Sequence, residues 1–232
     1  MDLIWNGFTE ALQLIFSGDA YVYEVMFTSL LVSGTATLIA LVLGLSIASF
    51  LAFRAFPGRT LTLTAFYAGT ALPPVVVGLL VSIMLWRTGP LGMLHLNYSR
   101  TAIIIAQAVI ATPIIAALST AALQSLNPNL RLQVLALGAS RWQAALLLFR
   151  EARLSLLAAA MAGFGAAISE VGATIMVGGN IKGSTRTLTS AIVLEVQQGD
   201  FETAIAFSLI LMGVIVAIVA VFTTLQQRRV GQ

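Results

Sequence analysis

The stretch Val25–Phe53, VMFTSLLVSGTATLIALVLGLSIASFLAF, decides the fold, because it contains no Asp, Glu, Lys or Arg over 29 residues. About 20 apolar residues in a helix are enough to cross the hydrocarbon core of a bilayer. A helix also satisfies its own backbone hydrogen bonds, which an isolated strand in lipid cannot do. This stretch therefore predicts a membrane-spanning helix.

Four further runs of similar length carry one charge between them. They are Thr60–Trp86, Thr101–Leu130, Leu154–Ile181 and Thr203–Gln227, and the one charge is Glu170. We therefore predict an all-α integral membrane protein, a single transmembrane domain over residues 1–232. Its five spanning helices are expected at about residues 25–53, 60–86, 101–124, 154–178 and 203–226.

The composition also points to lipid as the main solvent. Hydrophobic residues make up 59% of the 232 residues and charged residues only 9%, against about 45–50% and about 25% in soluble domains. A net charge of +3 is too small and too dispersed to indicate nucleic-acid binding. The absence of Cys excludes disulfides and a Cys nucleophile, and the single histidine, His95, makes no metal site.

Lys and Arg in the loops predict the orientation of the chain. With five spans, eight of these residues fall on one side of the membrane and four on the other. The larger set is Arg54, Arg59, Arg131, Arg141, Arg150, Arg153, Arg228 and Arg229, and the smaller set is Arg87, Arg100, Lys182 and Arg186. We expect the larger set to face the cytoplasm, which places the N-terminus outside and the C-terminus inside.

Residues 3–16 place apolar side chains such as Ile4, Phe8 and Ile15 at helical spacing. This pattern predicts an amphipathic helix, within residues 1–18, that lies on the outer membrane surface. A helix that simply extends the first span outward is the alternative.

The loop between the third and fourth spans, residues 126–150, is predicted to be cytoplasmic. Asn127 followed by Pro128 is typical of a helix start, and Gly138 is typical of a helix end. Ser140-Arg141-Trp142-Gln143 has the spacing of a capping box. The pattern predicts two helices separated by a glycine, with an ordinary helical linker as the alternative.

Ala136-Leu137-Gly138-Ala139-Ser140-Arg141, followed by an apolar run, resembles the loop through which permease subunits of ABC importers dock on their ATPase. The family pattern has Glu-Ala-Ala where this chain has Leu132-Gln133-Val134, and an apolar-x-x-Pro ending where it has Phe149-Arg150-Glu151-Ala152. The resemblance implies that the ATPase is contacted by Ala136, Leu137, Gly138, Ala139, Ser140 and Arg141.

A second resemblance covers roughly residues 126–210. Glu170–Thr174, Val177–Ile181 and Thr185–Thr189 are similar to the permeases of molybdate, sulfate and tungstate importers, and most of all to tungstate permeases. It implies a type I ABC importer permease (MetI-like) fold and a homodimer in the inner membrane. It also implies two cytoplasmic ATPase subunits that hold ATP and Mg²⁺, an extracytoplasmic tungstate-binding protein, and no cofactor in this chain.

Glu170 is the one charged side chain deep in a predicted span, where ionisable groups are costly and usually face a bundle interior. Because a carboxylate repels a dianion, we expect Glu170 to hold a helix contact, through a hydrogen bond to Ser, Thr or a backbone amide, or to be protonated. A role in a gate or pathway is the alternative. Thr174 is expected one turn onward on the same face.

Gly178-Gly179-Asn180 ends the fourth predicted span on the outer side. Helix termination is the simple interpretation, but glycines also let backbone amides approach an anion closely. The candidates for a translocation path or gate are Glu170, Thr174, Gly178, Gly179, Asn180, Thr185, Arg186 and Thr187. None of them is expected to hold a metal.

Prolines interrupt two of the predicted spans. Ala71-Leu72-Pro73-Pro74 is predicted to break the second span and Thr112-Pro113 the third. Proline kinks are tolerated in spanning helices. Pro73, Pro74 and Pro113 are either static bends or flex points for alternating access.

Other functions remain as alternatives. Within the importer class, molybdate or sulfate is the nearest alternative to tungstate. An ATP-independent channel or an ion-coupled carrier has no use for a docking loop, and coupled carriers usually show several midplane polar groups or inverted repeats. A membrane enzyme needs a nucleophile–base pair, a metal cluster or paired carboxylates. We find none in the sequence and expect a transport subunit whose partner hydrolyses ATP.

Overall fold

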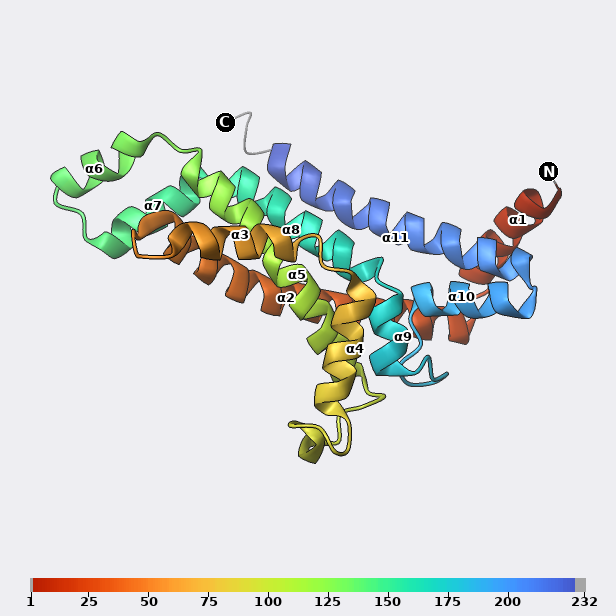
Figure 1. Cartoon of the computed structure of the whole chain (residues 1–232). Helices are drawn as coiled ribbons and strands as arrows, with labels where there is room; N and C mark the ends of the chain where they lie inside the picture. The colour runs from red at the N-terminus through yellow and green to blue at the C-terminus, as the bar shows by residue number, and fades with distance from the viewer. Residues whose placement is uncertain (1, 228–232) are drawn as a thin grey trace.

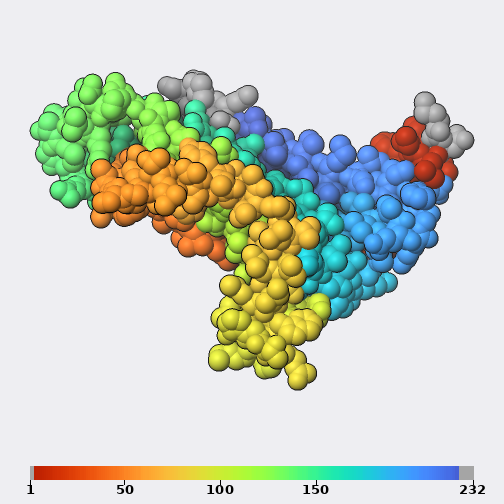
Figure 2. Space-filling model, in the orientation of Figure 1, coloured from red at the N-terminus to blue at the C-terminus, as the bar shows by residue number. Residues whose placement is uncertain are grey.

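The computed structural model describes residues 2–227, and this part of the chain is built of helices alone (Figure 1). Arg228 and Arg229, which were counted among the cytoplasmic charges, lie outside the described residues. Long helices lie side by side in the body of the molecule. An arm formed by α4 (Pro74–Leu85) and the short 3₁₀ helix η1 (Gly92–Leu94) stands out from this body (Figure 2).

The first helix, α1 (Asp2–Phe16), is separate from α2 (Ala20–Phe53). The Asp19 carboxylate accepts a hydrogen bond from the Val22 amide at 3.0 Å and so caps the start of α2. Residues 3–16 therefore do not extend the first span, and that alternative was wrong. Instead α1 packs against α11 (Phe201–Gln227), with Gly7 directly beside Ile205.

The centre of the body is the pair of helices α2 and α5 (Arg100–Gln124). Small residues let the two backbones approach closely: a Cβ atom on Gly44 would lie 2.8 Å from Cγ2 of Ile115. The predicted break at Thr112-Pro113 was wrong, because α5 continues through Pro113. Neighbouring helices pack along α5 and hold it together, while the Pro113 ring leaves the Val109 carbonyl without its usual helical donor.

The second predicted span is broken as expected, but the break is complete. Helix α3 (Arg59–Gly69) and α4 meet at an angle of 100° across residues 70–73. Pro74 is the first residue of α4, a position where no amide donor is needed and where proline is favoured. Pro73 is extended and precedes the helix. The prolines thus start a new helix and do not kink a continuous one.

The fourth predicted span is also broken, which the sequence analysis did not expect. Helix α8 (Arg153–Ile168) ends before Ser169, and α9 (Gly172–Gly178) starts a few residues later at an angle of 57°. A further helix, α10 (Leu188–Gln198), was missed and lies between α9 and α11. Thr187 caps α10 through reciprocal bonds with Ser190.

The helix–glycine–helix prediction for the loop before the fourth span is confirmed. Helix α6 (Pro128–Ala136) starts at Asn127, whose side chain accepts from the Asn129 amide at 2.9 Å. Gly138 then adopts a left-handed φ of 87°. Helix α7 (Arg141–Glu151) begins with the predicted capping box, in which Ser140 and Gln143 bond at 3.2 and 2.8 Å.

By length and composition, three helices of the described chain can each cross a membrane, namely α2, α5 and α11. Two more crossings follow if each bent pair, α3 with α4 and α8 with α9, counts as one span. The described chain is therefore a multi-pass helical body with three to five crossings.

The short helices α4 and α9 pack tightly on each other, and this contact generates a prediction. A Cβ atom on Gly78 would lie 2.5 Å from the Ala173 Cα atom, which is backbone that cannot yield cheaply. We expect Gly78→Ala to lower the free energy of unfolding by about 1–3 kcal/mol, a typical cost of overpacking. The measurement is thermal melting of the purified chain in detergent.

Gly165→Ala is the matched control, because Gly165 also lies in a bent pair but has open space around its Cβ position. That control should melt at the wild-type temperature or above it, since alanine favours a helix. Equal melting temperatures for Gly78→Ala and the wild type would contradict the close contact.

Candidate functional site

The two helix breaks border the same hollow, a cavity of about 340 Å³. Thr70, Pro73 and Pro74 line it from the break between α3 and α4, and Ser169 and Glu170 line it from the break between α8 and α9. Broken helices commonly frame the solute sites of membrane transporters, because their free backbone groups face a cavity. This cavity is therefore the best candidate for part of a solute path.

Glu170 lies two residues before the short helix α9. Its side chain is 8% exposed, and its Oε1 atom accepts a hydrogen bond from the Ala173 amide at 2.8 Å. Its backbone carbonyl accepts from the Thr189 hydroxyl at 3.1 Å. The expected bond to a backbone amide is confirmed, but the position deep inside an unbroken span was wrong. Glu170 lies at the break because its carboxylate replaces the helical acceptor that α8 no longer supplies.

A polar pair that the sequence analysis missed joins α5 to α9. Gln107 is 2% exposed, and its Nε2 atom donates to the Thr174 hydroxyl at 3.3 Å. The Gln107 carbonyl oxygen has no partner among the described residues. Gln107 is the one amide side chain in residues 101–123, and that isolation in an apolar run was the available signal.

The loop after α9 brings most of the other predicted residues together, but their polar groups form hydrogen bonds within the loop. Gly179 and Asn180 adopt left-handed φ values of 72° and 50° and turn the chain. The buried Thr185 hydroxyl donates to the Gly178 carbonyl and accepts from the Ile181 amide.

The Arg186 guanidinium is held in the same way. It donates to the Asn180 side-chain oxygen at 3.1 Å, to the Asn180 carbonyl at 3.2 Å and to the Tyr21 hydroxyl at 2.8 Å. Thr187 caps α10, and the Leu188 amide donates to the Ser29 hydroxyl of α2 at 2.7 Å. The segment from Gly178 to Thr187 is thus a strap held against the N-terminal part of α2. Of the eight predicted path residues, Glu170 alone lines the cavity between the breaks.

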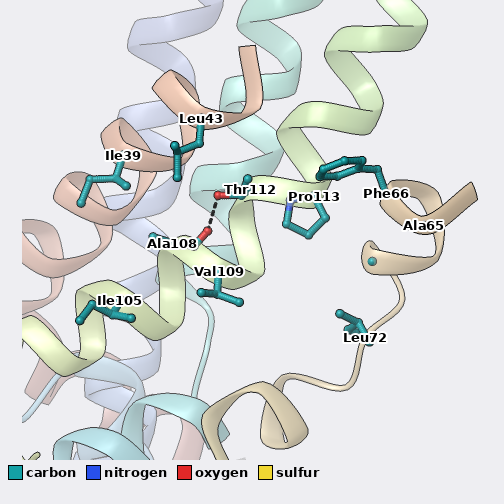
Figure 3. Close-up of a pocket in the computed structure, with 11 residues that line it drawn as sticks. Ile39, Leu43, Ala65, Phe66, Leu72, Ile105, Ala108, Val109, Thr112 and Pro113 are labelled. Carbon is teal, nitrogen blue, oxygen red and sulfur yellow. Dashed lines mark hydrogen bonds between the residues drawn. The ribbon is translucent and has the colours of Figure 1, made fainter. Parts of the chain in front are cut away.

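A second hollow is apolar and of a different kind. It has a volume of about 540 Å³ and lies between α2, α3 and α5. Figure 3 shows Ile39 and Leu43 of α2 on one side of it and Phe66 of α3 beside Pro113 of α5 on the other. Such a groove suits a hydrocarbon chain or a helix and gives a charged solute nothing to bind.

The segment α6–Gly138–α7 lies at the end of the molecule far from α1 and α10 (Figure 1). It displays large apolar side chains: Leu137 is 87% exposed and Trp142 is 78% exposed. Exposed apolar side chains gathered beside a fixed turn are typical of a docking surface for another protein. The ATPase contact assigned to Ala136–Arg141 stays a prediction.

Comparison with known proteins agrees with this architecture. Residues 22–232 match the family described as "Binding-protein-dependent transport system inner membrane component". The chain belongs to this family. Its members are multi-pass inner-membrane transport components of ABC transporters.

Several named relatives match over most of this chain and over most of their own length. The tungstate uptake system permease protein TupB of Peptoclostridium acidaminophilum is 38% identical over 227 residues, which cover 98% of this chain and 100% of TupB. A probable anion ABC transporter permease protein of Haloferax volcanii is also 38% identical, over 91% of this chain and 94% of its own length. The molybdenum transport system permease protein ModB of Escherichia coli K12 is 29% identical over 79% of this chain and 84% of its own.

Solved structures agree on the fold. A bacterial ABC transporter involved in alginate import aligns with a TM-score of 0.75 at 20% identity, over 96% of this chain and 82% of its own. At that identity the likeness concerns the fold alone, and it supports the MetI-like permease fold that the sequence resemblance implied.

The capping role of Glu170 generates a prediction. We expect Glu170→Ala to lower the free energy of unfolding by about 0.5–2 kcal/mol, because the buried Ala173 amide loses its acceptor. Glu170→Gln keeps a side-chain oxygen and should lose less than half as much. Thermal melting in detergent measures both variants.

Ser169→Ala serves as the control from the same break, since its hydroxyl only doubles a helical bond to the Gly165 carbonyl. It should melt like the wild type. If Glu170→Gln and Glu170→Ala lose the same amount, the carboxylate charge matters and the cap does not.

Proposed function

We propose that this chain is the permease of an ATP-driven importer that carries tungstate from the outside into the cytoplasm. The observation that carries the proposal is the 38% identity with the tungstate permease TupB across nearly the whole of both chains. Identity with the molybdenum permease falls to 29% over a smaller share. Import of molybdate or sulfate is the alternative, because these tetrahedral dianions resemble tungstate in size and charge.

The proposed assembly contains two copies of this chain, two cytoplasmic ATPase subunits and an extracytoplasmic binding protein. ATP and Mg²⁺ are held by the ATPase, and this chain carries no cofactor. In the proposed topology each bent helix pair crosses the membrane once, which gives five spans with the N-terminus outside. The distribution of Lys and Arg supports this orientation, because Arg54, Arg59, Arg131 and Arg141 all fall between proposed spans on the side assigned to the cytoplasm.

In this proposal the cavity between the two breaks is part of the path. Thr70, Ser169 and Glu170 supply polar groups to its lining, and the described lining includes no Lys or Arg. A dianion meets no cationic partner there, so it finds no tight resting site. Weak and few contacts suit a path, because a solute that binds tightly does not leave. Selection of tungstate is assigned to the binding protein.

The segment α6–Gly138–α7 is proposed to transmit movement from the ATPase. Its exposed Leu137 and Trp142 supply an apolar contact surface, and Arg141 supplies a charge for acidic groups. Closure of the ATPase pair would then pull on α7 and α8, and the packed pair α4–α9 would shift at the two breaks. In this proposal the pair α4–α9 is the gate, and the strap from Gly178 to Thr187 holds the outer side of that gate in place.

Transport in vesicles tests the proposed substrate. The full assembly, reconstituted with ATPase and binding protein, should accumulate radiolabelled tungstate only when ATP and Mg²⁺ are supplied to the cytoplasmic side. Tungstate should be preferred over molybdate and sulfate at equal concentration. Preferred uptake of molybdate or sulfate would favour the alternative substrates, and accumulation without the ATPase would point to a carrier or a channel.

A glycine substitution tests the coupling segment. We expect Gly138→Val to lose most of its tungstate uptake while ATP hydrolysis continues. A left-handed φ costs a β-branched residue about 1–2 kcal/mol, which changes the population of the docked turn about 5–30-fold. Uptake and hydrolysis are measured on the same vesicles.

Gly58→Val is the matched control, because Gly58 has a φ of 83°, open space around its Cβ position, and a place in the other proposed cytoplasmic loop. It bears the same backbone strain and should retain the wild-type ratio of uptake to hydrolysis. Equal ratios for Gly138→Val and the wild type would overturn the coupling role.

A further inference from the structure

A basic pocket of about 540 Å³ lies where α2 ends, beside α6 and α7. Three arginines from separate segments line it: Arg54 just after α2, Arg131 in α6 and Arg141 at the start of α7. The residues described around the pocket include no carboxylate. Three positive charges therefore share one hollow without a neighbouring acid to neutralise them.

Two of these arginines are held in place by aromatic rings of α2. The Arg54 guanidinium lies 5.6 Å from the centre of the Phe50 ring. The Arg131 guanidinium lies 5.5 Å from the centre of the Phe53 ring and donates one bond to the Phe53 carbonyl at 3.1 Å. A guanidinium has five N–H donors, so Arg131 keeps four. Paired donors of this kind match the oxygens of a phosphate group.

The pocket continues into an apolar surface along α2. Ile39, Leu43, Ser46, Phe50 and Phe53 follow the spacing i, i+4, i+7, i+11, i+14, which places them on one face of the helix. The last three line the basic pocket, and the first two line the apolar groove of Figure 3. At 1.5 Å per residue this face is about 21 Å long, which exceeds the roughly 15 Å half-thickness of the hydrocarbon core.

We propose that this face binds one anionic phospholipid, with its phosphate between Arg54 and Arg131 and an acyl chain along α2 toward the groove. Clustered basic residues at the cytoplasmic end of spanning helices are suited to acidic headgroups. The face is apolar apart from Ser46, whose hydroxyl donates to the Val42 carbonyl, and it favours a lipid over a free inorganic anion, which would gain nothing from it. The proposal does not depend on which solute the chain transports.

Native mass spectrometry of the purified full-length chain tests the proposal. The protein in detergent is offered equal amounts of phosphatidylglycerol and phosphatidylcholine with identical acyl chains. We expect phosphatidylglycerol to be retained in preference. Each basic residue near the surface contributes about 1 kcal/mol, which is about fivefold in affinity. Arg54→Gln should therefore lower retention of phosphatidylglycerol about fivefold, and Arg54→Gln with Arg131→Gln about 25-fold.

Two controls separate this site from general surface charge and from misfolding. Arg150 and Arg153 border another hollow together with Glu151, so the double variant Arg150→Gln, Arg153→Gln should keep the lipid preference. Arg54→Lys keeps the charge and should retain most of the binding. Arg54 is exposed, so its variants should melt like the wild type, and they keep the test valid if Arg131→Gln fails to fold.

Four outcomes would overturn the proposal. Equal retention of the two lipids, or equal loss in the Arg150 and Arg153 variant, would leave only unspecific attraction. Displacement of phosphatidylglycerol by excess inorganic phosphate or tungstate would make the pocket a site for free anions. Dissociation of a dimer in the Arg54 variants, without a change in lipid retention, would assign the face to a second copy of the chain.

Discussion

Backbone amides and carbonyls that leave a helix inside a membrane must find other partners, because lipid offers none. At the two breaks in this chain, residues close to the break remove or satisfy these backbone groups. At the first break, Pro73 and Pro74 have no amide hydrogens to satisfy. At the second, the Glu170 side chain accepts from the Ala173 amide, and the Thr189 hydroxyl donates to the Glu170 carbonyl. Both breaks can therefore persist beside a cavity without a large energetic cost.

The breaks create two short helices, α4 and α9, that pack tightly on each other. Gly78 of α4 touches the backbone of Ala173 in α9, and Val75 reaches Gly172. Where lipid removes the hydrophobic driving force, helices associate through close packing at small residues together with interhelical hydrogen bonds. The Gln107–Thr174 bond then ties α9 to the continuous helix α5. The arm is consequently anchored at its base, and movement is expected at residues 70–73 and 169–171.

The sequence predicted most of the long elements, because charge gaps report the cost of placing Arg, Lys, Asp or Glu in lipid. Capping patterns at Asn127 and Ser140 also located α6 and α7, since each cap is satisfied by residues next to it. The break at Ser169–Val171 was missed because it depends on contacts from outside the segment, such as the Thr189 hydroxyl on the Glu170 carbonyl. At Pro113 the error was the reverse: a break was predicted, but α5 continues because neighbouring helices hold it together around the proline.

In the described chain, the arginines discussed above lie away from the cavity between the two helix breaks. This separation bears on transport of a dianion. Arg186 belongs to the strap, and three of its five N–H donors already bond to Asn180 and Tyr21. Arg54 and Arg131 lie at the far end of α2, and the cavity between the breaks is lined by hydroxyls, apolar groups and one carboxylate. A free arginine in that cavity would hold a doubly charged oxyanion strongly and slow its release. In the proposed importer, capture is therefore assigned to a separate binding protein, and this cavity offers the solute only weak contacts.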